Sequence, residues 1–129
     1  MDPIADMLST IKNSYAVGKK NVVLAYSRPK LLLGQILLKE GFLAKVEEKE
    51  DEKGKKEIVL GLSYQGRTPA LSGFERLSKP GRRLYSQRED LPEISRRLGK
   101  VIISTPMGLL TAKEALEKNQ GGELICRVW

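Results

Sequence analysis

The sequence contains no histidine and a single cysteine, and both shortages limit its chemistry. Without histidine, the chain lacks the imidazole used in many acid–base and metal sites. Cys126 alone excludes an internal disulfide and a two-cysteine metal clamp, so we expect a small buried residue there. No apolar run approaches the roughly 20 residues of a membrane span. No secretory signal opens the chain. We therefore expect a soluble, cytoplasmic protein with no membrane partner.

Motifs of enzymatic chemistry are also missing. The sequence has no Gly-x-x-x-x-Gly-Lys-Ser/Thr phosphate loop, and its acidic residues are scattered over expected helix surfaces and a hairpin tip. No nucleophile stands with a matching base, and no pair of carboxylates is evident. The sequence therefore predicts a protein that is not an enzyme, has no cofactor or metal, and takes no small-molecule substrate.

Basic residues exceed acidic ones, 23 to 16, and this excess is concentrated in the second half of the chain. Residues 1–66 hold 11 basic and 9 acidic residues, whereas residues 67–129 hold 12 and 7, which gives +2 and +5. The second half carries eight of the nine arginines, whose planar guanidinium groups suit phosphate and base stacking. Such a charge distribution indicates a polyanionic partner such as nucleic acid.

One stretch, from Arg76 to Arg88, contains five basic residues and no acidic one. A solvated surface explains such a run as well as a phosphate-binding surface does. The 129 residues form one domain by default, although two small domains also fit the length. A turn-like stretch around Gly66 and Arg67 suggests the division into 1–66 and 67–129.

Apolar spacing and turn signals predict the elements of the first part. Asp2 and Pro3 open a helix that ends before Gly18, and Ser27 caps a second one. The expected order is α-β-α-β-β: the first helix, a buried strand at Asn21–Ala25, a helix at Pro29–Glu40, and hairpin strands at Phe42–Glu50 and Glu57–Leu62.

The second part is expected to be strand-rich with two short helices. A Thr111–Glu114 capping box predicts the second of these helices. The expected elements are strands Ala70–Leu77 and Arg82–Tyr85 around a Ser78–Gly81 turn, a helix Leu91–Leu98 capped by Asp90, a strand Val101–Ser104, a helix Ala112–Lys118, and a last strand Glu123–Trp129 with Leu124, Cys126 and Val128 on one face. Both parts together predict an α+β fold of two small α+β domains.

A short stretch with two hydroxyls, Ser104–Gly108, is the main candidate for a binding site. It is expected between a strand and a capped helix, where hydroxyls and backbone N–H groups would face outward and bind sugar hydroxyls, base edges or phosphate. The alternative is an ordinary connection. Tyr85 either stacks on a base or packs in the core. Gly121 and Gly122 either admit an RNA backbone or form a turn.

Several segments, taken in order, resemble the bacterial small-subunit ribosomal protein S-eight family (the eighth protein of the small ribosomal subunit). These segments are Asp2–Leu8 with Ile11–Asn13, Ser78–Gly81, Arg83–Tyr85, Ile102–Thr105, Gly108, Gly121–Cys126 and Val128–Trp129. The resemblance implies two α+β domains and a structural, primary rRNA-binding protein. Such a protein binds the central domain of small-subunit rRNA and helps to assemble the subunit platform beside neighbouring ribosomal proteins. It resides on the cytoplasmic ribosome, with an organellar ribosome as the alternative.

The same resemblance assigns the main RNA contacts to the C-terminal domain and auxiliary contacts to the N-terminal one. A second reading is a translational repressor that binds its own messenger RNA outside the ribosome. The RNA-binding candidates are Ser104, Thr105, Gly108, Tyr85, Arg83, Lys79, Gly122 and Glu123, with Lys12, Asn13 and Lys30 in the N-terminal domain.

This chain departs from the family pattern at four positions near these candidates. Pro106 stands where a serine is common and removes a hydroxyl and an N–H. Met107 replaces a frequent lysine, and Arg127 an aromatic residue. Arg82 is an additional cation in an ordinarily apolar position.

Overall fold

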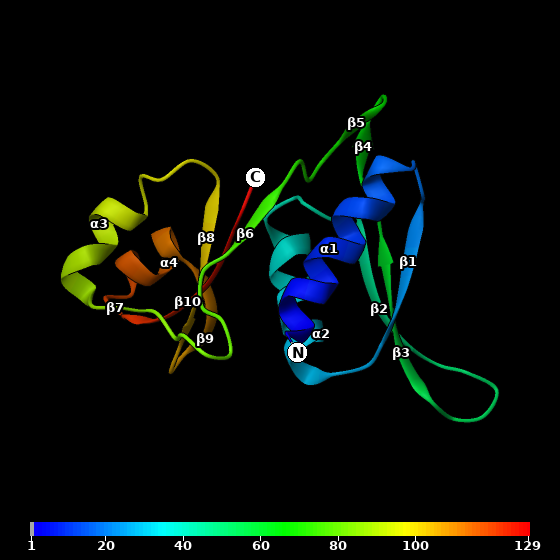
Figure 1. Ribbon diagram of the computed structural model, residues 1–129, viewed down its shortest axis with the longest axis horizontal. Coiled ribbons are helices and arrows are strands. Elements are labelled where there is room, and N and C mark those ends of the chain that lie inside the picture. Colours follow the sequence, from blue (N-terminus) through cyan, green and yellow to red (C-terminus); the bar gives the residue numbers. More distant parts are fainter. Residues whose placement is uncertain (1) are drawn as a thin grey trace. The chain divides into compact units, whose positions relative to one another are not determined.

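The computed structural model describes residues 2–129, which form two units (Figure 1). One unit is Pro3–Ser72, and the other is Gly73–Trp129 together with Asp2. The structure thus divides the chain after Ser72 rather than at the turn around Gly66. The reason is local: Gly66 lies in the turn between two short paired strands, β4 (Tyr64–Gln65) and β5 (Thr68–Pro69), and both belong to the first unit.

The first unit has the predicted α-β-α-β-β order, followed by the β4–β5 hairpin. Its elements are α1 (Pro3–Ala16), β1 (Asn21–Ala25), α2 (Arg28–Lys39), β2 (Lys45–Glu50) and β3 (Lys56–Gly61). The strands form an antiparallel sheet in the order β1-β3-β2, and the two helices lie against it in Figure 1. Ser27 caps α2, because its hydroxyl accepts the N–H of Lys30 at 3.3 Å.

Apolar residues of the two helices and of β3 form the core of this unit. Leu8 and Ile11 from α1, Leu33 and Leu37 from α2, and Leu60 from β3 are fully buried. β1 departs from the expected buried strand, since it lies at the sheet edge and leaves Val23 58% exposed. The β-branched residues of β1 therefore correctly indicate a strand, but they do not indicate that both of its faces are buried.

The second unit is an antiparallel sheet with two short helices. Its elements are β6 (Phe74–Arg76), β7 (Tyr85–Ser86), the 3-10 turn η1 (Arg88–Asp90), α3 (Leu91–Ile94), β8 (Lys100–Thr105), β9 (Gly108–Thr111), α4 (Ala112–Glu117) and β10 (Gly122–Val128). The strand order is β6-β10-β8-β9, and β7 also pairs with β10. The mixed α+β fold predicted from the sequence is confirmed.

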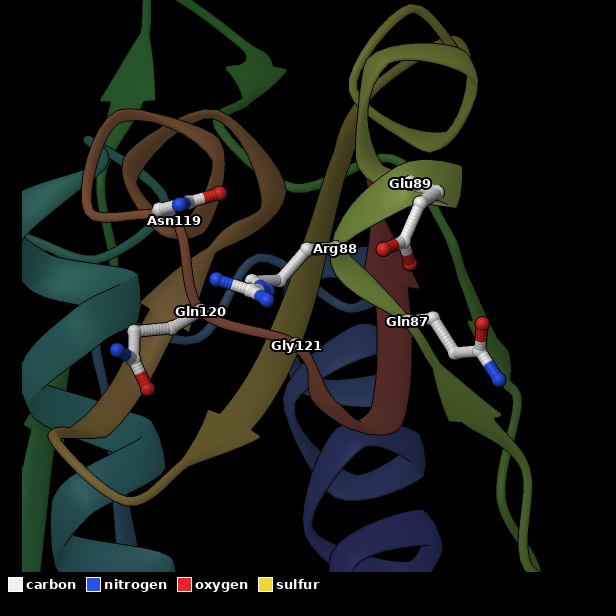
Figure 2. A pocket seen from close by; sticks show the side chains of 6 residues that line it. All are labelled: Gln87, Arg88, Glu89, Asn119, Gln120 and Gly121. Carbon is white, nitrogen blue, oxygen red and sulfur yellow. The ribbon is translucent and has the colours of Figure 1, made fainter.

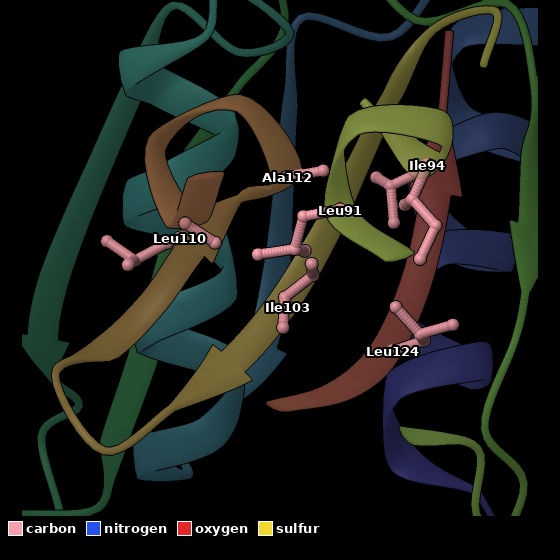
Figure 3. Close-up of a cluster of buried hydrophobic side chains, with 8 residues drawn as sticks. Leu91, Ile94, Ile103, Leu110, Ala112 and Leu124 are labelled. Atoms are coloured by element: carbon pink, nitrogen blue, oxygen red, sulfur yellow. The ribbon is translucent and has the colours of Figure 1, made fainter. Parts of the chain in front are cut away.

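A cluster of buried side chains joins α3 and α4 to one face of this sheet (Figure 3). Leu91 and Ile94 come from α3, while Ile103, Leu110 and Leu124 come from the strands. The predicted capping box starts α4: the Thr111 hydroxyl accepts the Glu114 N–H at 3.2 Å, and the Glu114 carboxylate accepts the Thr111 N–H at 3.1 Å.

One predicted helix and two predicted strands of this unit are shorter than expected. The helix at Leu91 ends at Ile94, and Asp90 makes no side-chain cap, because the preceding 3-10 turn already gives Asp90 a helical backbone. The strands predicted on either side of the Ser78–Gly81 turn shrink to β6 and β7. They do not pair with each other; both pair with β10.

The last strand also differs from its prediction because it contains a β-bulge. Leu124 pairs with Ile103 of β8, whereas Cys126 pairs with the adjacent Ile102. Paired residues of antiparallel strands share a face, so Leu124 and Cys126 lie on opposite faces of the sheet. The three alternating residues that begin with Leu124 are all buried, but they do not lie on one face.

Candidate nucleic-acid interface

Four strands of the second unit bring three of the predicted site residues into one line. Tyr85 of β7 pairs with Glu123 of β10, Glu123 pairs with Ser104 of β8, and Ser104 pairs with Leu109 of β9. Since directly paired residues share a face, their side chains form a row across the sheet. The next residue on β8, Ile103, belongs to the helix-covered cluster, so the row lies on the opposite face.

The row presents groups that suit RNA. Tyr85 is 70% exposed, so its ring is not packed in the core and is accessible to a base. Ser104 and Glu123 are half-buried. Within residues 2–129 the Ser104 hydroxyl makes no hydrogen bond, whereas the Glu123 carboxylate pairs with the Arg83 guanidinium at 3.2 Å. Ser104 therefore offers a free donor and acceptor at the centre of the row.

The predicted loop around Thr105 has a different geometry from the expected strand–helix connection. β9 follows it directly, so residues 104–108 end a β8–β9 hairpin instead of lying beside a helix N-terminus. The Thr105 hydroxyl donates to the Gly108 carbonyl at 2.8 Å and accepts the Met107 N–H at 3.1 Å. Thr105 is buried, and its hydroxyl stabilises the turn instead of facing outward. Pro106, Met107 and Gly108 are exposed at the tip.

The two adjacent glycines serve close packing within the protein. A Cβ on Gly122 would stand 2.0 Å from the Ser104 carbonyl oxygen, and one on Gly121 would stand 2.5 Å from the Ser86 carbonyl oxygen. Contacts this short are not tolerated, so both positions require glycine for β10 to approach β7 and β8. Their role in forming the row is therefore indirect: they hold Tyr85 and Ser104 beside Glu123.

Three basic residues of the predicted run lie on one exposed loop beside the row. Lys79, Arg82 and Arg83 are exposed, and the backbone groups of Lys79 and Arg82 pair with each other at 2.9 Å. The buried Ser78 closes the base of this loop: its hydroxyl accepts the Leu84 N–H at 2.9 Å and donates to the Leu84 carbonyl at 3.1 Å. The loop thus projects cations next to Tyr85.

The other two arginines of the run have separate environments. The Arg76 side chain is only 9% exposed, and it pairs with the Asp2 carboxylate at 3.0 Å and donates to the Ile125 carbonyl. It therefore has a structural role. Arg88 is exposed and lines a polar pocket of about 490 Å³, shown in Figure 2. The sequence did not predict this pocket, because Asn119 and Gln120 lie between the expected helix Ala112–Lys118 and the glycine pair and belong to no recognised binding motif.

The N-terminal candidates lie in the first unit. Lys12 and Asn13 are exposed neighbours on α1, and Lys30 is half-buried in the first turn of α2. Their side chains make no hydrogen bond or ion pair within residues 2–129, so all three remain available to a ligand.

Two further observations concern reactive groups. Cys126 is fully buried, as predicted, and burial raises the pKa of its thiol to about 12, which keeps it protonated and unreactive. Within residues 2–129, no three carboxylate or thiol groups gather as metal ligands. In the same part of the chain, no helix is long and apolar enough to cross a membrane.

Comparison with known proteins identifies the family. The family model described as Ribosomal protein S8 matches residues 2–129. A small ribosomal subunit protein uS8 from Cupriavidus metallidurans is 42% identical over 127 residues, covering 98% of this chain and 96% of the relative. The uS8 protein of Dictyoglomus turgidum is 45% identical over 128 residues, covering 99% and 97%. The uS8 protein of Kosmotoga olearia is 44% identical over 133 residues, covering 99% and 98%.

The chain therefore belongs to the ribosomal protein S8 family. This is a family of structural proteins of the small ribosomal subunit that bind rRNA, and it is not a family of enzymes.

Proposed function

We propose that this chain binds the central domain of small-subunit rRNA, mainly through its C-terminal unit. The observation that carries the proposal is the row across the C-terminal sheet. It places an exposed aromatic residue, Tyr85, and a free hydroxyl, that of Ser104, on either side of Glu123, on the sheet face opposite α3 and α4. The cations of the Lys79–Arg83 loop flank this row.

The chemistry of the row fits the accessible surface of folded RNA. The major groove of an A-form helix is too narrow for side chains, so proteins read its shallow minor groove, 2′-hydroxyls and unstacked bases. A short hydroxyl such as Ser104 can exchange hydrogen bonds with a 2′-hydroxyl or a base edge. Tyr85 supplies a stacking surface, and Lys79 and Arg82 supply phosphate contacts that make the affinity sensitive to salt.

The N-terminal unit supplies further contacts to the RNA. The exposed Lys12 and Asn13, with Lys30, add backbone contacts from the N-terminal unit. Binding of the rRNA then helps to assemble the subunit platform next to neighbouring ribosomal proteins, on the cytoplasmic ribosome. No feature of residues 2–129 favours the alternative of a messenger RNA repressor, so it is not proposed.

Binding to a central-domain rRNA fragment tests the proposal. The replacement Ser104→Ala should weaken binding by ~1–3 kcal/mol, which is the contribution of one good base contact. Ser72→Ala, at an exposed serine outside the row, is the matched control and should bind normally. Chemical footprinting of the wild type should protect a helix of the central domain. Protection confined to another rRNA domain, or none at all, would overturn the proposal.

The charges are tested by salt dependence. Arg83→Ala should lower the slope of log affinity against log salt by about one if its guanidinium meets a phosphate. Glu123→Gln is the informative partner variant, because it removes the ion pair and leaves Arg83 in place. An unchanged slope in Arg83→Ala would show that this arginine serves only to hold Glu123.

A further inference from the structure

The polar pocket of the second unit lies beside the row but is not part of it. Two segments form its walls: residues 87–89, after β7, and residues 119–121, before β10 (Figure 2). It is a shallow, polar depression of about 490 Å³ that is largely open to solvent. In Figure 2 the Arg88 side chain extends from one wall across the pocket toward the other.

The backbone holds the two walls in fixed positions. Gly122 pairs with Ser86, and Gly121 approaches so closely that an added Cβ would lie 2.5 Å from the Ser86 carbonyl oxygen. Asn119 has a left-handed backbone with φ of 58°, and the Gln120 N–H donates to the Ala115 carbonyl at 2.9 Å. The backbone of both walls is therefore fixed before a ligand binds, which lowers part of the entropic cost of binding.

The polar groups of the pocket have no partners within the protein. Among residues 2–129, the side chains of Asn119, Gln120 and Arg88 make no hydrogen bond or ion pair. The two amides each offer donors and an acceptor, and the guanidinium offers a fork of donors for a phosphate. Glu89 is the acidic member of the lining. The combination suits a ligand with both a hydrogen-bonding edge and a negative charge.

We propose that this pocket binds a single unpaired nucleotide of the RNA. The amides of Asn119 and Gln120 contact the base edge, and Arg88 contacts the phosphate. The inference rests on the proposed rRNA binding, because the pocket adjoins the row: Gly122–Ser86 and Glu123–Tyr85 are successive pairs of one ladder. A paired base inside an A-form helix cannot enter a pocket, whereas a base outside the stack can.

The test combines one protein variant with abasic scanning of the RNA. The variant Asn119→Gly with Gln120→Ala removes both amides, and glycine tolerates the left-handed backbone, so folding should be preserved. Gln35→Ala removes an exposed amide on α2 and serves as the control. Affinities are measured for the central-domain fragment and for copies with one unpaired nucleotide made abasic at a time.

For the one unpaired nucleotide that the pocket binds, removal of the base should weaken wild-type binding about 10-fold. The double variant should bind the intact RNA about 10-fold more weakly and should show no further loss with that abasic RNA. The Gln35→Ala protein should respond to the abasic RNAs as the wild type does.

The outcomes separate the pocket from the general interface. If the wild type binds the fragment tightly but the double variant binds equally well, the pocket inference is wrong and the proposed function stands. Equal sensitivity of the double variant and the wild type to every abasic position also refutes the pocket. If the wild type fails to bind the fragment, the proposed function itself fails.

Discussion

Replacing Thr105 by valine should destabilise the protein, because the Thr105 hydroxyl closes the β8–β9 turn. It donates to the Gly108 carbonyl at 2.8 Å and accepts the Met107 N–H at 3.1 Å. Each hydrogen bond contributes about 0.5–1.5 kcal/mol net, so loss of both should cost about 1–3 kcal/mol. Valine keeps the shape of the side chain, which leaves the missing hydrogen bonds as the main effect. The melting temperature should fall by roughly 5 °C or more.

Ser104→Ala is the matched comparison. The hydroxyls of Ser104 and Thr105 belong to neighbouring residues, but only that of Thr105 has hydrogen-bond partners. The free Ser104 hydroxyl stabilises nothing within residues 2–129, so its loss should leave the free energy of unfolding within about 0.5 kcal/mol of wild type while RNA binding weakens. Urea unfolding and RNA titration of both variants measure the contrast. A Thr105→Val protein as stable as the wild type would refute the assignment of this hydroxyl to the turn.

Three other predictions follow from packing and burial. Gly122→Ala should destabilise the second unit by several kcal/mol and abolish RNA binding, since its Cβ would lie 2.0 Å from the Ser104 carbonyl oxygen; urea unfolding measures this, and a near-neutral effect would contradict the strand register. Burial raises the pKa of the Cys126 thiol to about 12, whereas the thiol of the unfolded chain ionises near pH 9. Because only the unfolded state loses this proton between pH 9 and pH 12, the free energy of unfolding should fall by about 1.4 kcal/mol per pH unit in that range. Cys126→Ala should remove that component of the slope. Tyr15→Phe should cost about 1–3 kcal/mol of stability, because the buried hydroxyl donates to the Phe42 carbonyl at 2.7 Å and accepts the Ser63 N–H at 3.0 Å; thermal unfolding tests it, and an unchanged midpoint would contradict it.

Local signals predicted most helices and strands. The Thr111–Glu114 capping box and the Ser27 cap depend on contacts within a few residues, so their sequence patterns were sufficient. The β1 strand was predicted with its observed bounds, but its burial was not, because burial depends on its place at the sheet edge. The helix after Asp90 was predicted too long: it ends at Ile94, and the N–H groups of Arg96 and Arg97 then bond to carbonyls three residues back instead of continuing the helix.

The arrangement of the site depended on information that sequence patterns lack. The row of Tyr85, Glu123 and Ser104 is fixed by the pairing register of three strands, and a bulge after Leu124 shifts that register by one residue. β9 is only four residues long and runs directly into α4, so Thr105 looked like part of a strand–helix loop. Nothing local distinguishes a threonine that closes a turn from one that faces a ligand.

The hydroxyl of Ser78 makes the basic loop a replaceable insert. The two ends of the loop are closed by the Ser78–Leu84 hydrogen bonds, and Leu77 and Leu84 pack against the core cluster on either side. The ends of residues 79–83 are therefore held by contacts that lie outside the loop; the contacts from within it are the Lys79–Arg82 backbone pair and the Arg83–Glu123 ion pair. This loop is the natural position for grafting a different peptide onto the scaffold, with Ser78 and Leu84 as the splice points.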